Sequence, residues 1–140
     1  MKKALILILS IALLSGCAGL MKDSRQSIEA ARGNFGIQVL GVRLTAAGQM
    51  IDFRYRIIDT VKAAPLMKPR NRAYLTHERT GIKMKVPSLP KVGSLRQFSS
   101  VAKKDRNYAI LFSNPGQLIK RGDMVTVEIG KMRLEHLVVE

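Results

Sequence analysis

The amino-acid sequence predicts an all-β protein, an antiparallel β-sandwich that follows an N-terminal leader and a short tether. Its 140 residues leave room for one small domain. From residue 35 onward, seven or eight short runs rich in β-branched and aliphatic residues are separated by turns that contain Gly, Pro or Asn. This spacing favours an immunoglobulin-like sandwich, although no Cys…Trp…Cys signature accompanies it, and a small open barrel is the alternative.

The first 16 residues have the pattern of a secretory signal peptide. Two lysines at residues 2–3 are followed by an apolar run over residues 4–14. A helix that spans a bilayer needs about 20 apolar residues, so this run is too short to do so. The run ends in a tetrapeptide that resembles the lipobox of bacterial lipoproteins, Leu14-Ser15-Gly16-Cys17. The alternative is an ordinary secretory peptide that has a cysteine near its cleavage site.

The resemblance to bacterial lipoproteins implies a lipid anchor and a membrane localisation for the protein. In that family the cysteine sulfur receives a diacylglycerol, residues before the cysteine are removed, and the new amino group is acylated, as by palmitate. Cys17 is then the lipidation site, and its acyl chains hold the protein durably on a membrane. The residue after the cysteine is Ala18 and not Asp. In the sorting pattern of lipoproteins that this resembles, the absence of an Asp at this position implies the outer membrane, facing the periplasm. Because Cys17 is the only cysteine, a disulfide framework is excluded.

Residues 17–34 form the predicted tether. They are small and polar and show no strand alternation. Asp23 or Ser24 has the side chain of a helix N-cap, and a two-turn helix is expected to run through Arg32 with Gly33 just after it. A helix of that length is marginal in isolation. We therefore expect a spacer, and the sequence leaves open whether it docks on the domain.

The first strands of the domain, which spans residues 35–140, are predicted with the clearest pattern. Residues 37–44 are rich in β-branched and aliphatic side chains, and a turn follows over 45–48. Residues 49–58 alternate strictly between apolar and polar side chains, which is typical of a half-buried strand. The apolar side chains of that strand are expected on one face, namely Ile51, Phe53, Tyr55 and Ile57.

The remaining strands are predicted from turn signals and apolar runs. A hairpin is expected between residues 72–77 and 82–86, with Gly81 in its turn and Ile82, Met84 and Val86 pointing inward. Residues 95–99 form a weaker strand, and residues 107–113 are apolar on both faces, as in a central strand. Two further strands, 124–129 and 132–139, flank Gly130. The aromatic residues of these strands are expected in the core rather than in a ligand site, namely Phe53, Tyr55, Tyr108 and Phe112.

In its strand order and its NPGQLIKRGD turn (residues 114–123), the part after the tether resembles small periplasmic lipoproteins with sandwich domains. This resemblance implies a sandwich fold and carries no activity, cofactor or site residue.

The positive charge of the chain is concentrated in its middle third. The whole sequence has 24 Lys and Arg against 10 Asp and Glu, and residues 62–106 hold twelve of these cations but only two acids. Two Pro-containing loops, residues 64–70 and 87–91, lie in this region and are expected at the surface. Such a patch attracts anionic partners. The candidate contact residues are Lys68, Arg70, Arg72, Lys91, Lys103 and Lys104; the alternative is a protein that is mildly basic everywhere.

Catalytic chemistry has little to build on in this sequence. It contains two histidines and none of the hydrolase, zinc-protease or phosphate-loop motifs. An enzyme would need His77 and His136 to meet an acid in one cleft. We therefore predict no catalytic residues and no cofactor.

A copper site is the alternative functional interpretation. Met67, His77 and Met84 lie on or beside one predicted hairpin, and thioether and imidazole groups suit Cu(I). The His-x-Met pair of copper chaperones is missing, however. Met84 also serves as core filler, and His77 at a strand end is expected at the surface.

The sequence thus predicts a lipid-anchored envelope protein with a non-enzymatic binding or structural role. Its partner, contacted through residues 62–106, is an envelope protein or an anionic envelope polymer rather than a nucleic acid or a small-molecule substrate.

Overall fold

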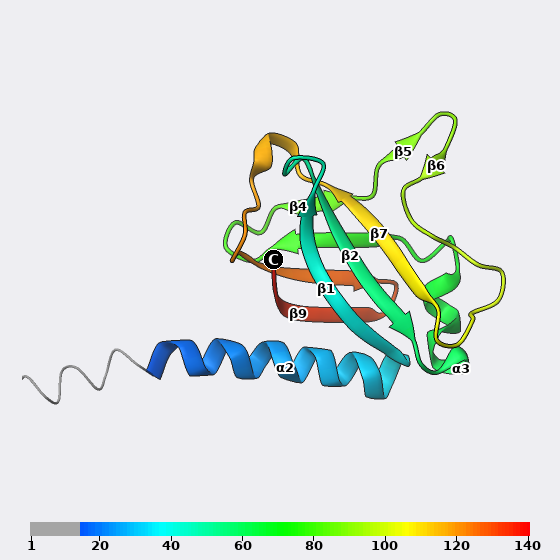
Figure 1. Ribbon diagram of the computed structural model, residues 1–140, viewed down its shortest axis with the longest axis horizontal. Coiled ribbons are helices and arrows are strands. Elements are labelled where there is room, and N and C mark those ends of the chain that lie inside the picture. Colours follow the sequence, from blue (N-terminus) through cyan, green and yellow to red (C-terminus); the bar gives the residue numbers. More distant parts are fainter. Residues whose placement is uncertain (1–14) are drawn as a thin grey trace, which may run out of the picture.

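The computed structural model describes residues 15–140 of the chain (Figure 1). Most of the predicted leader, including Leu14 of the lipobox, therefore lies outside the described residues. The described part begins with one long helix, α2 (Ser15–Phe35), and continues almost entirely as strands and short turns. Within it, no helix has both the length and the apolar composition that crossing a membrane requires.

Two antiparallel sheets form the body of the domain. The first has the order β1-β2-β7, from β1 (Ile37–Thr45), β2 (Met50–Ile57) and β7 (Asn107–Ser113). The second has the order β4-β3-β8-β9, from β3 (Ala73–His77), β4 (Lys83–Lys85), β8 (Met124–Ile129) and β9 (Met132–Val138). A small hairpin of β5 (Ser88–Leu89) and β6 (Gly93–Ser94) stands apart from both. The predicted all-β sandwich is confirmed, and the sheets do not close into a barrel.

The strand order also supports the immunoglobulin-like interpretation. If the seven strands of the two main sheets are lettered A to G along the chain, the sheets read A-B-E and D-C-F-G. A constant-type immunoglobulin domain has the sheets A-B-E-D and C-F-G. The two arrangements differ only in strand D (β4), which pairs with C here and with E in the constant-type domain. The last residues of the chain add a parallel contact between the sheets, because Val42 of β1 bridges to Val139.

The core lies between the two sheets and contains the side chains that the alternation predicted. Ile51, Phe53, Tyr55 and Ile57 all have no exposed surface. Tyr108, Ile110 and Phe112 of β7 lie beside them, and the four predicted core aromatics are thus buried. The Tyr55 ring stacks at 5.6 Å from Phe53 and 5.9 Å from Tyr108, measured between ring centroids.

Three local predictions about strands need correction. Ile82 is 46% exposed, because β4 begins only at Lys83 and Ile82 belongs to the preceding turn. Residues 95–99 do not form the predicted strand. Within this segment, Arg96 forms an isolated antiparallel bridge to Ile110, at the edge of β7 that faces away from β2. The outward face of β7 is half-buried rather than buried, so β7 lacks the two covered faces of the predicted central strand.

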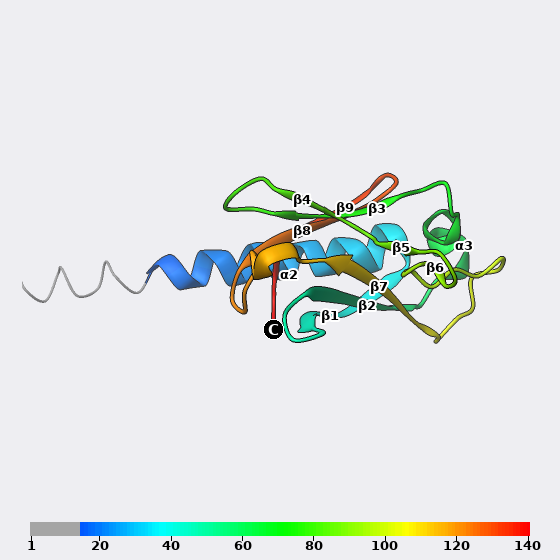
Figure 2. The same cartoon turned by 90° about the horizontal axis from the view of Figure 1, so that it is seen from above.

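The tether contains a much longer helix than the sequence predicted. α2 has 21 residues and is therefore about 31 Å long. Its C-terminal half packs against β9 and β1, where Ala31 is completely buried (Figures 1 and 2). Packing of this half against the two strands stabilises the helix. The left-handed residue that ends it is Gly36, with φ of +64°, and not Gly33, which lies within the helix.

Candidate functional site

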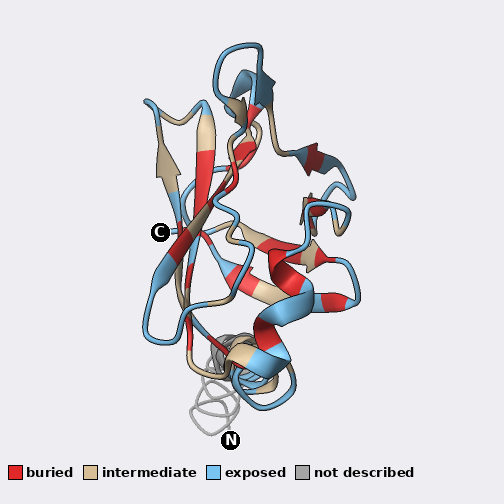
Figure 3. Cartoon of the chain, turned by 90° about the vertical axis from the view of Figure 1, so that its right-hand side faces the viewer, coloured by how far each residue is buried: buried red, intermediate tan, exposed pale blue. Residues whose placement is uncertain are grey.

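The six predicted contact cations lie on segments at one end of the molecule. Lys68, Arg70 and Arg72 belong to the connection from β2 to β3, and Lys91, Lys103 and Lys104 belong to the connection from β4 to β7. Both connections lie at the end toward which α2 runs, on the right in Figures 1 and 2. We call this the basic end. Figure 3 looks onto it and shows its short helix and loops mostly exposed.

The charges of the basic end are largely uncompensated. Its two segments, residues 59–72 and 86–106, contain nine cations and two acids, a net charge of +7. All six predicted contact cations are exposed. Among the residues that the structure describes, the ion pairs involve other arginines, lysines and histidines, and none of these six takes part. The clustering turns a basic stretch of sequence into a basic surface.

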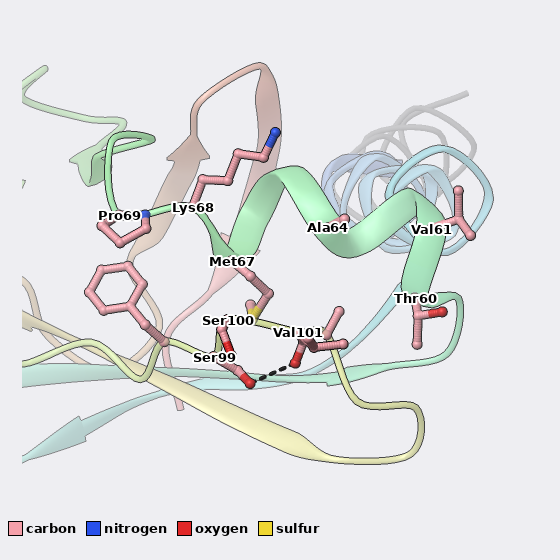
Figure 4. Close-up of a pocket in the computed structure, with 11 residues that line it drawn as sticks. Thr60, Val61, Ala64, Met67, Lys68, Pro69, Ser99, Ser100 and Val101 are labelled. Atoms are coloured by element: carbon pink, nitrogen blue, oxygen red, sulfur yellow. Dashed lines mark hydrogen bonds between the residues drawn. The ribbon is translucent and has the colours of Figure 1, made fainter.

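An apolar groove of about 870 Å³ lies in the middle of this end (Figure 4). One wall is formed by the short helix α3 (Thr60–Ala63) and the 3-10 helix η1 (Ala64–Met67), and the other by residues 98–102. The Met67 side chain points into the groove, whereas Lys68 extends away from it. Val61 is 83% exposed and Val101 is 67% exposed, so the groove carries uncovered apolar surface on both walls.

Local sequence signals build the α3 wall. The Asp59 side chain caps α3 by accepting hydrogen bonds from the backbone N–H groups of Val61 at 3.0 Å and Lys62 at 3.1 Å. The Gly36 carbonyl accepts backbone hydrogen bonds from Ile58 and Asp59. The Lys62 ammonium then donates to the Gly33 carbonyl of α2 at 2.7 Å. The wall is thus tied to the C-terminal end of α2.

Arg96, which sequence reasoning did not single out as a site residue, holds the other side of this region together. It is only 6% exposed. Its guanidinium donates to the Asn71 carbonyl at 2.5 Å and to the Leu66 carbonyl, and it lies 4.8 Å from the centre of the Phe98 ring. Burial lowers the pKa of Arg96 from its usual value. No motif marks Arg96, because its burial depends on the loop that folds over it.

The two histidines are not brought together. His77 lies on the inward face of β3 with no exposed surface, which contradicts the expectation that it is a surface residue. Its Nδ1 is 2.9 Å from the Thr80 hydroxyl, and its Nε2 lies 3.4 Å from Asp123 Oδ2. His136 lies on the other face of the same sheet, where it contacts Glu78. The single cleft that an enzyme hypothesis requires is therefore not formed by these two imidazoles.

Glu78 forms the centre of a small polar network on that outer face. Its Oε1 accepts hydrogen bonds from the Thr126 hydroxyl at 2.8 Å and the His136 backbone N–H at 2.7 Å, and its Oε2 is 2.9 Å from His136 Nδ1. Burial by itself would raise the pKa of Glu78, but these hydrogen bonds outweigh it and lower the pKa. The hydrogen bond with Glu78 raises the pKa of His136. The network joins the β3–β4 turn to β9.

The candidate copper ligands do not form one set. Met67 ends η1, before β3 begins, and His77 is the last residue of β3, about 13 Å beyond its first residue at the usual rise per residue. Met84 is paired with Leu75 and is 3% exposed, as expected for core filler. Within residues 15–140, no group of three His, Cys, Asp or Glu residues is placed to hold a metal ion.

Cys17, the predicted lipidation site, lies in the first turn of α2, at the opposite end of the helix from the basic end. Compared with known proteins, the chain matches no family, and no curated protein and no solved structure is significantly similar to it.

Proposed function

We propose that this protein is a lipid-anchored envelope protein that binds a partner protein through its basic end and has no catalytic role. The partner presents an acidic segment with apolar side chains. One observation carries the proposal: six exposed cations without ion pairs among the described residues lie on the segments that surround an apolar groove. Positive charge attracts the acidic segment and selects its orientation, and the groove receives its apolar side chains.

The groove favours a protein partner over a purely hydrophilic polymer. An anionic glycan would gain from the charges but has no use for exposed Val61, Val101 and Phe98. Contiguous apolar surface of this kind, bordered by polar residues, is typical of protein interaction sites. A segment that alternates acidic and apolar residues fits both features of the basic end at once.

The proposed anchor and the proposed contact surface lie at opposite ends of the molecule. The lipobox resemblance places the acyl chains on Cys17, at the start of α2, and α2 runs about 31 Å toward the basic end. An anchored molecule would then present the groove away from the membrane that holds it. This geometry supports a partner in the periplasmic space, or one on a facing surface.

The proposal is tested by site-specific photocrosslinking of the full chain in a bacterial host. A photoreactive residue at Val101, in the groove, is compared with one at Ile82, an exposed position in the turn at the opposite end. We expect a discrete crosslinked species from Val101 and none of the same mass from Ile82. The species should weaken as salt is raised, because exposed charges are screened.

Charge reversal supplies the matched variants. The change Lys103→Glu with Lys104→Glu removes the crosslink, whereas Lys120→Glu with Arg121→Glu, an equal change of charge in the turn before β8, leaves it intact. A Val101 crosslink that survives the first pair, or that is lost equally with the second, would contradict a contact through the basic end.

A further inference from the structure

Arg96 is a buried cation without a counter-ion. It is the one lysine or arginine among the described residues that is buried, and no carboxylate pairs with it there. Two of its nitrogens donate to backbone carbonyls, and its Nε has no partner. Burial raises the pKa of Tyr55 to about 12, so that hydroxyl stays protonated and supplies no negative charge. A buried charge normally has an ionic or metal partner.

Arg96 lines a second cavity, of about 390 Å³, at the basic end. Arg72, on the loop before β3, and Lys85, on β4, also line it, and both are exposed. Three residues that carry hydroxyl groups complete the polar lining, namely Tyr74, Ser88 and Ser94. No acidic residue lines this cavity, so its three cationic residues have no compensating charge in the lining.

The chemistry of this lining favours an anion. Three cationic residues attract negative charge and repel other cations, and the hydroxyl groups and the exposed Arg72 and Lys85 are suitable hydrogen-bond donors to an oxyanion. A doubly charged anion neutralises more of the positive charge of three cations than a single carboxylate does. The cavity exceeds the volume of one phosphate ion, and Ala73, Val86 and Phe98 give it an apolar side.

From this lining we infer that the cavity bounded by Arg72, Lys85 and Arg96 is a binding site for a phosphomonoester, whose phosphate is held by the cations and whose organic part lies against the apolar side. Arg96 supplies fixed positive charge from the interior. Arg72 and Lys85 reach the phosphate from the rim, and the β5–β6 serines donate their hydroxyl hydrogens. The inference does not rest on the proposed partner protein. The linings of this cavity and of the Val61–Val101 groove share Pro69 and Phe98 but no polar residue, although Arg72 is also one of the six contact cations of the basic end.

The site is tested with the full chain purified in detergent micelles, by titration calorimetry at about 0.15 M salt, where distant surface charges are screened. The probes are inorganic phosphate, glycerol 3-phosphate, and mixed micelles that contain phosphatidic acid or, as a control, phosphatidylcholine. We expect saturable binding of one phosphomonoester per chain. Binding of glycerol 3-phosphate identifies a free ester as the ligand, and binding restricted to phosphatidic acid identifies a lipid headgroup.

Two sets of variants connect the binding to this cavity. Arg72→Gln with Lys85→Gln changes exposed side chains that are not needed for packing, and it should weaken binding at least about tenfold, as expected for loss of charge-assisted hydrogen bonds. Lys120→Gln with Arg121→Gln removes the same charge elsewhere and should leave the affinity unchanged. Absence of saturable binding to all phosphate probes, or equal losses in the two sets, would overturn the inference. Val101→Asp separates it from the proposed function, because this change should affect the crosslink but not phosphate affinity.

Discussion

His136 Nδ1 lies 2.9 Å from Glu78 Oε2, although 58 residues separate the two in the chain. The contact forms because His136 adopts a left-handed backbone conformation, with φ of +58°, which brings its N–H and its ring to the same carboxylate. The pair thus connects the turn after β3 to the last strand.

This pair predicts a pH dependence of stability. The pKa of His136 is raised in the folded state, so its contribution is full below the unfolded value of 6.5 and is lost as the pH rises through the folded value. The pKa of Glu78 is lowered, so its contribution is full above 4.5 and is lost as the pH falls. We expect the pair to stabilise most between pH 4.5 and 6.5. His136→Asn, which tolerates the left-handed conformation, should flatten this part of the profile of Tm against pH. An unchanged profile would show that the contact contributes nothing.

Two glycines three residues apart should respond to alanine in opposite directions. At Gly36 the φ of +64° is unfavourable for alanine, and a Cβ would lie 2.6 Å from the Asp59 carbonyl oxygen. Gly36→Ala should therefore lower the free energy of unfolding by at least about 2 kcal/mol. Gly33 is helical with nothing within 4 Å of its Cβ position, so Gly33→Ala should raise it by about 0.5 kcal/mol. Urea denaturation measures both, and a Gly36→Ala protein as stable as Gly33→Ala would refute the assigned end of α2.

Asn114, at the start of the NPGQLIKRGD turn, is a buried polar side chain with three hydrogen bonds. Its Nδ2 donates at 2.8 Å to the Gly48 and Ile119 carbonyls, and its Oδ1 accepts from the Ile119 N–H at 3.0 Å. Asn114→Ala leaves these buried groups without partners, so thermal and urea unfolding should show a loss of about 3 kcal/mol. The control Asn107→Ala removes an exposed contact and should cost far less. Similar losses for the two variants would argue against this network.

The proposed anchor gives a prediction about processing. Metabolic labelling with a fatty acid should mark the wild-type chain expressed in a bacterial host, and Cys17→Ser should abolish the label and leave an uncleaved or released species. Lys22→Ala, a change in the exposed part of α2, serves as the control and should be labelled like the wild type. Labelling that persists in Cys17→Ser would exclude the lipobox interpretation.

Local periodicity explains which parts of the fold the sequence could predict. The alternation around Phe53 and Tyr55 needs only the two-residue repeat of a strand, and both are buried as expected. The burial of His77 and Arg96 depends on what folds over them, which no local pattern contains. The length of α2 likewise depends on its docking against β9. The prediction that Ile82 points inward was wrong for a different reason. β4 begins one residue later than predicted, at Lys83, and Ile82 is left exposed in the preceding turn.

The candidate site was predictable in its charge and not in its shape. Lys68 and Lys103 belong to connections far apart in sequence, and the sandwich topology brings both connections to one end. The basic composition could therefore be noticed beforehand, and the groove between Val61 and Val101 could not. Arg96 was counted among the cations, but its role in fixing the loop from Leu66 to Asn71 requires the folded chain.

The one-sided charge of the basic end also gives the molecule a permanent electric dipole. The field of an approaching anion exerts a torque on this dipole, and the torque turns the basic end toward the anion before any contact is made. Orientation before contact raises the association rate, and since the Debye length is about 10 Å at 0.1 M salt, the gain disappears as salt increases. A partner of the basic end should therefore show an association rate that depends steeply on salt, and a dissociation rate that hardly changes.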